Sequence, residues 1–173
     1  QIIYYLSFSS ILSKNKKKLK RPQDLPISIL IFAKNKGEEL LENLPFILEQ
    51  NYSKFEIILI NNDSSDEVTD DILESLQEKY PSIIKVINIE NKEAFWGKKK
   101  YALTLGIKAA KYNHLVFTEA NCRPISNNWI SEMNANFSKK KTIVLGYTRF
   151  KNENTFLNLF PTPPTKKLPR TFR

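Results

Sequence analysis

Residues 115–124 read LVFTEANCRP, and this stretch decides how the rest of the chain is interpreted. The apolar run at 115–117 predicts a buried strand. Glu119 and Asn121 follow it, with Ala120 between them. On an extended backbone, residues two apart point to the same side, so both oxygen-bearing side chains should face one point beyond the strand. A hard divalent cation binds such oxygens. The plainer interpretation is a strand that enters a polar loop.

Apolar and amphipathic stretches alternate before this segment. Near-continuous apolar runs at 27–33, 55–60 and 83–89 predict buried strands of a parallel sheet. Between the strands, helical spacing of apolar residues predicts helices at 38–50, 67–80 and 98–112. Such alternation implies right-handed crossovers and an α/β, Rossmann-like fold, a mostly parallel sheet flanked by helices. A helix at 130–137 and a strand at 142–147 should follow.

Polar loops follow the first, second and fourth of these expected strands, and they contain Asn35, Asn62 and Glu119. Parallel strands end at one edge of their sheet, and ligands of open α/β sheets bind outside that edge. Several polar loops that converge there form the geometry of a ligand site. This convergence favours a functional interpretation of Glu119 and Asn121 over a plain loop entry.

The net charge of +9 lies in the ends of the chain. Residues 1–21 hold six Lys and Arg, residues 166–173 hold four, and neither segment has an acidic residue. These two segments hold ten of the 27 basic residues, so the rest of the chain has 17 basic and 18 acidic residues and is nearly neutral. A basic face for specific nucleic-acid binding is therefore not supported. The single cysteine, Cys122, excludes a disulfide within the chain.

The first residues, QIIYYLSFSSIL, are apolar and aromatic, and a basic run follows at 14–21. Twelve residues are too few to cross a bilayer, which needs about twenty. We interpret 1–21 as the end of a transmembrane or membrane-proximal segment with a basic linker, which places the following domain on the cytoplasmic side. A peripheral amphipathic helix or a disordered tail is the alternative.

Four segments in a fixed order carry a resemblance to a known family: ISILIFAKN at 27–35, FEIILINNDSSD at 55–66, GKKKYAL at 97–103 and LVFTEANCRPISNNWI at 115–130. Together they resemble the family 2 glycosyltransferases, particularly membrane-anchored bacterial ones. The resemblance implies a GT-A fold, of which residues 22–160 would form the nucleotide-binding half. It implies transfer of a sugar from a nucleoside diphosphate sugar, with UDP favoured by family analogy, to a hydroxyl of a glycan or lipid acceptor. It also implies Mg²⁺ or Mn²⁺, which offsets charge on the departing diphosphate.

The resemblance implies candidate site residues as well. Asn62 corresponds to an Asp that contacts the base in the family, and Lys99 to a basic residue near the phosphates. The full nucleotide-binding set is Ala33, Asn35, Asn62, Asp66, Lys99, Lys100 and Ala120. Glu119 and Asn121 correspond to the two Asp of the D-x-D metal motif. Because one carboxylate replaces two, the metal site should be weakened.

The catalytic base of the family comes from a later segment, and no residue of this chain can be assigned to it. We therefore expect the base in a missing C-terminal half, and little or no transferase activity from this chain. Residues 161–173, PTPPTKKLPRTFR, contain four prolines and no periodicity, so we expect a disordered tail. The change of character there suggests a frameshift or premature end.

Two other functions stay open. A degenerate, non-catalytic module would bind nucleotide without metal and without turnover. A binder of anionic surfaces would act through its basic tails, and its binding would be sensitive to salt.

Overall fold

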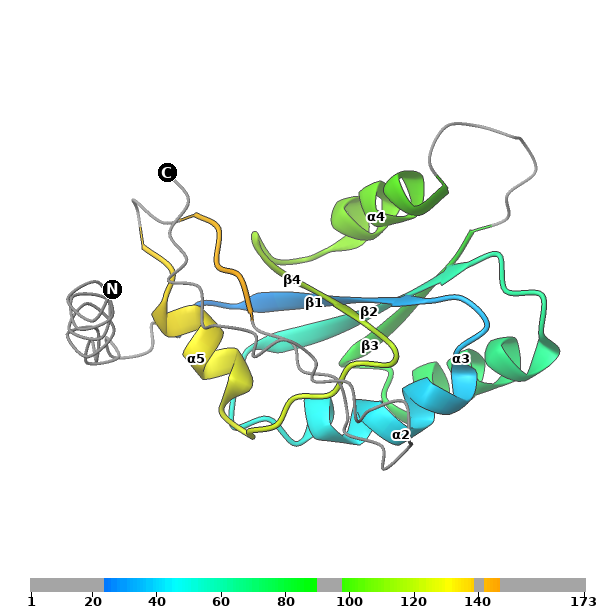
Figure 1. Ribbon diagram of the computed structural model, residues 1–173, viewed down its shortest axis with the longest axis horizontal. Helices are drawn as coiled ribbons and strands as arrows, with labels where there is room; N and C mark the ends of the chain where they lie inside the picture. The colour runs from blue at the N-terminus through cyan, green and yellow to red at the C-terminus, as the bar shows by residue number, and fades with distance from the viewer. Residues whose placement is uncertain (1–23, 90–97, 139–141, 147–173) are drawn as a thin grey trace, which may run out of the picture. The chain divides into compact units, whose positions relative to one another are not determined.

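Figure 1 shows the computed structural model of the protein, which describes residues 24–89, 98–138 and 142–146. The chain divides into two units, Arg21–Asn134 in one, and Gln1–Lys20 with Ala135–Arg173 in the other. In the second unit, residues 142–146 have no regular secondary structure, so the strand expected at 142–147 is wrong over these residues. Ile143 and Leu145 are exposed there, because no sheet buries their apolar pattern.

The first unit is built on a sheet of four parallel strands in the order β3-β2-β1-β4. The strands are β1 (Ile27–Ala33), β2 (Phe55–Asn62), β3 (Ile84–Ile89) and β4 (His114–Glu119). β1 and β2 are the central strands and consist mainly of isoleucine and leucine, because both of their faces are covered. The predicted α/β fold with a parallel sheet is confirmed.

Helices cover both faces of this sheet (Figure 1). They are α2 (Gly37–Leu48), α3 (Glu67–Lys79), α4 (Lys98–Ala109) and α5 (Trp129–Ala135). Leu44 of α2, Leu73 of α3 and Ile130 of α5 share one core with alternate side chains of the strands. Ala102 of α4 packs on the opposite face, against Leu30, Ile58 and Ile60. Each isoleucine or leucine buried in this way stabilises the fold by about 1.5–3 kcal/mol.

The start of α2 packs tightly against α3. The backbone N–H of Gly37 donates a 2.9 Å hydrogen bond to Oγ1 of Thr69, a residue with no exposed surface. A Cβ added at Gly37 would lie 2.9 Å from the Cα of Thr69. A glycine is needed here because the two helices approach too closely for a side chain. This contact fixes the loop after β1 relative to the loop after β2.

Within the described ranges, no helix is both long enough and apolar enough to cross a membrane. The membrane-proximal segment predicted at 1–21 and the disordered tail predicted at 161–173 lie outside the described residues.

Candidate functional site

The site candidates gather at the carboxyl edge of the sheet because all four strands are parallel. Ala33 ends β1 and is fully buried between its two neighbouring strands. In the register of the sheet, Ala33 lies beside Asn61 of β2, and Phe32 lies beside Glu119 of β4. The last residue of β2, Asn62, therefore lies on one side of β1, and Glu119 lies on the other.

Asn35 connects the first two loops of this edge. Its side-chain nitrogen donates to Oγ of Ser65 at 3.1 Å, and its side-chain oxygen accepts from the N–H of Ser65 at 2.8 Å. Its own N–H donates to Oγ of Ser64 at 3.0 Å. Its φ of 50° lies in the left-handed region, which asparagine tolerates better than most residues. These bonds occupy both ends of the Asn35 amide, and its contact with nucleotide stays a prediction.

Two buried oxygens have no partner at the end of β2. Asn62 is 4% exposed, and within the described residues its Oδ1 makes no hydrogen bond. The same holds for Oδ1 of Asp66, whose other oxygen accepts a 2.6 Å bond from the hydroxyl of Thr69. An unsatisfied buried acceptor costs about 1–3 kcal/mol. Asn62 at the end of β2 and Asp66 at the start of α3 therefore each present a buried acceptor that a ligand's donor could satisfy.

The neighbouring Asn61 behaves differently. Its side-chain nitrogen donates to Asp70 at 2.6 Å and to Asn88 at 3.2 Å, and its oxygen accepts from the N–H of Ser64 at 3.2 Å. Successive strand residues point to opposite faces, so Asn61 faces α3 while Asn62 faces the side of α4, as Ile58 and Ile60 do. Asn61 is a structural residue, and Asn62 is the one available to a ligand.

The backbone after Glu119 is not extended as the sequence suggested. β4 ends at Glu119, and the N–H of Cys122 donates to the carbonyl of Glu119 at 3.0 Å, which closes a turn. Asn121 lies within that turn and is exposed. The expectation that Glu119 and Asn121 follow one another on extended backbone is therefore wrong, because the loop bends to meet α2.

The side chain of Asn43 on α2 holds this turn by a hydrogen bond. Its side-chain nitrogen donates to the carbonyl of Ala120 at 3.0 Å and to that of Glu39 at 2.7 Å. The N–H of Ala120 also donates to the carbonyl of Phe32 at 3.2 Å, and Ala120 is buried. Sequence reasoning missed Asn43. Its signal was a polar residue on the apolar face of a helix, beside Leu40, Leu44 and Ile47.

Lys99 of α4 lies directly over the end of β4. Its Nζ donates to Oε1 of Glu119 at 2.5 Å, and the same Nζ lies 5.0 Å from the centre of the Phe32 ring. Both side chains of the ion pair are about half exposed, at 56% and 51%. Lys100 is also exposed. Phe32 was not predicted as a site residue, because its apolar strand context looked like ordinary core.

These residues fit a divalent cation poorly. Mg²⁺ and Ca²⁺ take six or more oxygen ligands, and their affinity depends on the number of charged ones. Glu119 supplies one carboxylate, which is already bound to an ammonium, and Asn121 supplies no charge. In the described part of the chain, no group of three or more His, Cys, Asp or Glu side chains could hold a metal ion. Metal binding by Glu119 and Asn121 stays a prediction.

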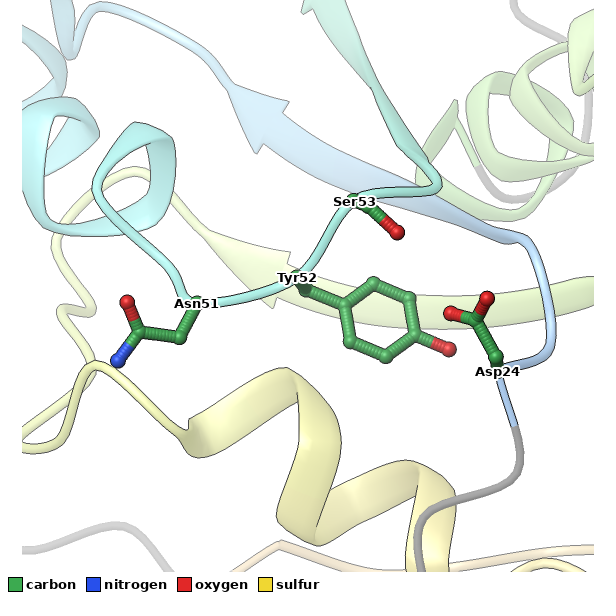
Figure 2. A pocket seen from close by; sticks show the side chains of 4 residues that line it. All are labelled: Asp24, Asn51, Tyr52 and Ser53. Carbon is green, nitrogen blue, oxygen red and sulfur yellow. The ribbon is translucent and has the colours of Figure 1, made fainter.

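A separate hollow of about 510 Å³ lies at the opposite edge, before β1 and β2 begin. Its lining residues are Asp24, Asn51, Tyr52 and Ser53. In Figure 2 the ring of Tyr52 extends toward Asp24, and Asn51 points away from both. The Tyr52 hydroxyl donates to the carbonyl of Leu25, and burial raises the pKa of that hydroxyl. The hollow lies at the amino ends of β1 and β2, away from the carboxyl edge where the candidate site residues gather.

Solved structures with the same fold are glycosyltransferases. A mannosyltransferase, PcManGT from Pyrobaculum calidifontis, solved with GDP-Man and Mn²⁺, has a TM-score of 0.62 and 20% identity over 78% of this chain and 39% of its own. GalNAc-T7, solved with UDP, GalNAc and Mn²⁺, has a TM-score of 0.57 and 25% identity over 68% of this chain and 22% of its own. Residues 1–349 of TarS from S. aureus have a TM-score of 0.50 and 19% identity, over 62% of this chain and 31% of that chain. The protein thus spans well under half of each.

The likeness to these structures identifies the GT-A fold that the sequence predicted. Comparison with curated proteins gives no match. The family model described as glycosyl transferase family 2 matches residues 28–172. That range extends past 130, where the last of the quoted segments ends, and it includes most of the proline-rich end. Because the match covers most of its 173 residues, the chain belongs to glycosyl transferase family 2.

Proposed function

We propose that this chain binds a nucleoside diphosphate sugar, with a UDP-sugar favoured, and serves transfer of the sugar to a hydroxyl of a glycan or lipid acceptor. Membership of glycosyl transferase family 2 supports sugar transfer in general. The nucleotide would lie over the carboxyl edge of the sheet, with its base at the end of β2 and its phosphates toward Lys99. The catalytic base is not assigned to any described residue.

The observation that carries this proposal is the two buried oxygens without a partner, one at the end of β2 and one at the start of α3. Oδ1 of Asn62 and Oδ1 of Asp66 are acceptors without a partner in the described residues. Uracil presents an N–H donor at ring position 3, and the ribose presents hydroxyl donors. Cytosine presents an acceptor nitrogen at the same ring position, so an Asn62 oxygen placed to accept from that position would face a lone pair. Guanine also presents a ring N–H, so the oxygens by themselves favour uracil and guanine over cytosine.

Calorimetric titration of UDP, GDP and CDP into the protein tests the proposal. We expect UDP to bind and CDP to bind about tenfold or more weakly, since one buried hydrogen bond is at stake. Equal affinity for UDP and CDP would refute the base assignment. Binding that disappears between 50 and 200 mM salt for all three nucleotides would instead indicate non-specific attraction to the basic ends.

A second candidate, a nucleotide-binding module without turnover, is favoured by the single carboxylate at Glu119 and its bond to Lys99. Incubation with UDP-sugars and detection of released UDP separates the two. Release of UDP when an acceptor glycan or lipid is present supports transfer, and binding without release supports the module.

We also propose that residues 1–21 attach the protein to the cytoplasmic face of a membrane. The support is the sequence, an apolar stretch followed by six basic residues. Sedimentation of the full chain with anionic vesicles tests this proposal. Attachment that resists both high salt and alkaline carbonate indicates insertion, whereas release by salt indicates surface attraction.

A further inference from the structure

The end of β4 already holds a positive charge. The Lys99 ammonium lies 2.5 Å from the carboxylate of Glu119 and 5.0 Å from the centre of the Phe32 ring. Phe32 and Glu119 are register partners on neighbouring strands, so the ammonium is held over the carboxyl ends of β1 and β4 at once. A carboxylate and an aromatic face both attract a cation. Two groups, one on β1 and one on β4, therefore converge on the charge that α4 supplies.

The ammonium can still bind an anion. A lysine has three N–H donors, and Glu119 accepts one of them. The Lys99 side chain is 56% exposed, so the remaining donors are available to a ligand over the edge of the sheet. Phosphate oxygens are acceptors for such donors, and lysine binds phosphate as a point charge. The pair is electrically neutral, and a diphosphate would share the ammonium with Glu119.

A divalent cation at the same place would meet two obstacles. It would have to displace the ammonium from the only carboxylate that this turn offers. It would also lie beside the charge of Lys99, with the exposed Lys100 next along α4. Repulsion by these charges and the shortage of charged oxygen ligands both weaken metal binding.

We propose that the ammonium of Lys99, instead of a divalent cation, is the positive charge that this site presents to the diphosphate of a bound nucleotide. Binding of UDP then requires no metal. The inference rests on the proposed function, because it assigns the charge partner of the same nucleotide. It differs from the metal-dependent binding expected from the family, because Lys99 and Glu119 neutralise one another before any ion is added.

The first experiment is calorimetric titration of UDP and of uridine, each in EDTA and in Mn²⁺, with the full chain. We expect UDP affinity in EDTA to lie within about threefold of that in Mn²⁺. Lys99→Gln should weaken UDP binding about 10- to 100-fold, the range for a hydrogen bond to a charged group, and leave uridine binding unchanged. Lys108→Gln, an exposed lysine in the last turn of the same helix, is the matched control and should change neither.

Binding of UDP that is lost in EDTA and restored by Mn²⁺ would overturn the inference alone and leave the proposed function intact. Equal UDP affinity of the protein and Lys99→Gln would also overturn it. Absence of UDP binding in both EDTA and Mn²⁺ would refute the proposed function, and the inference with it.

The second experiment follows Mn²⁺ itself by electron paramagnetic resonance, with no nucleotide present. The double substitution Lys99→Gln with Asn121→Asp removes the ammonium and supplies a second carboxylate in the turn. We expect this variant to bind Mn²⁺ at least about tenfold more tightly than the unchanged protein, because metal affinity follows ligand charge. If the unchanged protein binds Mn²⁺ as tightly as the variant, Lys99 does not occupy the cation's place.

Discussion

Replacing Asn62 with leucine should leave the fold intact and weaken nucleotide binding. The side chain is 4% exposed, and its Oδ1 is buried without a partner in the described residues. Leucine has nearly the same shape and branches at the same carbon. Removal of an unsatisfied buried oxygen relieves part of a penalty of about 1–3 kcal/mol. We therefore expect Asn62→Leu to raise the free energy of unfolding by about 1 kcal/mol, or about 4 °C in Tm.

The matched control is the preceding residue. Asn61 is equally buried, but its amide has three hydrogen-bond partners, on α3, on β3 and in the following loop. Asn61→Leu removes these bonds and leaves the carboxylate of Asp70 with one partner fewer. At about 1 kcal/mol for each bond, we expect a loss of about 2–4 kcal/mol. Adjacent asparagines in one strand should thus give changes of opposite sign.

Urea unfolding followed by circular dichroism measures both variants, and calorimetry measures their affinity for UDP. Asn62→Leu should weaken UDP binding about tenfold or more, since it removes the acceptor proposed for the base. Destabilisation by more than about 2 kcal/mol would show that Oδ1 of Asn62 has a structural partner, and would refute the reasoning. A UDP affinity of Asn62→Leu within twofold of that of the unchanged protein would also refute the reasoning.

Three further substitutions test the contacts that hold the loops of the site in place. Thr69→Val breaks the bonds of its hydroxyl to Gly37 and Asp66 and should cost about 1–3 kcal/mol in urea unfolding, whereas Thr69→Ser should recover most of that loss. Gly37→Ala places a Cβ 2.9 Å from the Thr69 backbone, so we expect about 1–3 kcal/mol of destabilisation, and an unchanged Tm would contradict the packing described. Asn43→Ala removes the hydrogen bond to the carbonyl of Ala120, so hydrogen exchange of the turn should become faster and urea unfolding should show a loss of about 1–2 kcal/mol.

The sequence predicted the candidate site less completely than the fold. It located Asn62 and Glu119 at one edge, because parallel strands place their carboxyl ends together. It did not predict that Asn35 is bonded to Ser64 and Ser65, or that Asn61 and Asn62 have opposite roles. Hydrogen bonds between loops about 30 residues apart depend on how the loops meet, and a local pattern of residue types carries no such information.

The sequence by itself determined the order of elements and the parallel sheet of the first unit. Continuous apolar runs separated by amphipathic stretches bury their surface well in only a few arrangements, and right-handed crossovers reduce these further. Only the tertiary structure decided the charge partner of Glu119. Lys99 lies twenty positions away on another element, and α4 had to pack on the face of the sheet formed by β1 and β2 before its ammonium could reach the carboxylate. Spacing along the chain predicted a metal at this point, whereas packing places a lysine there.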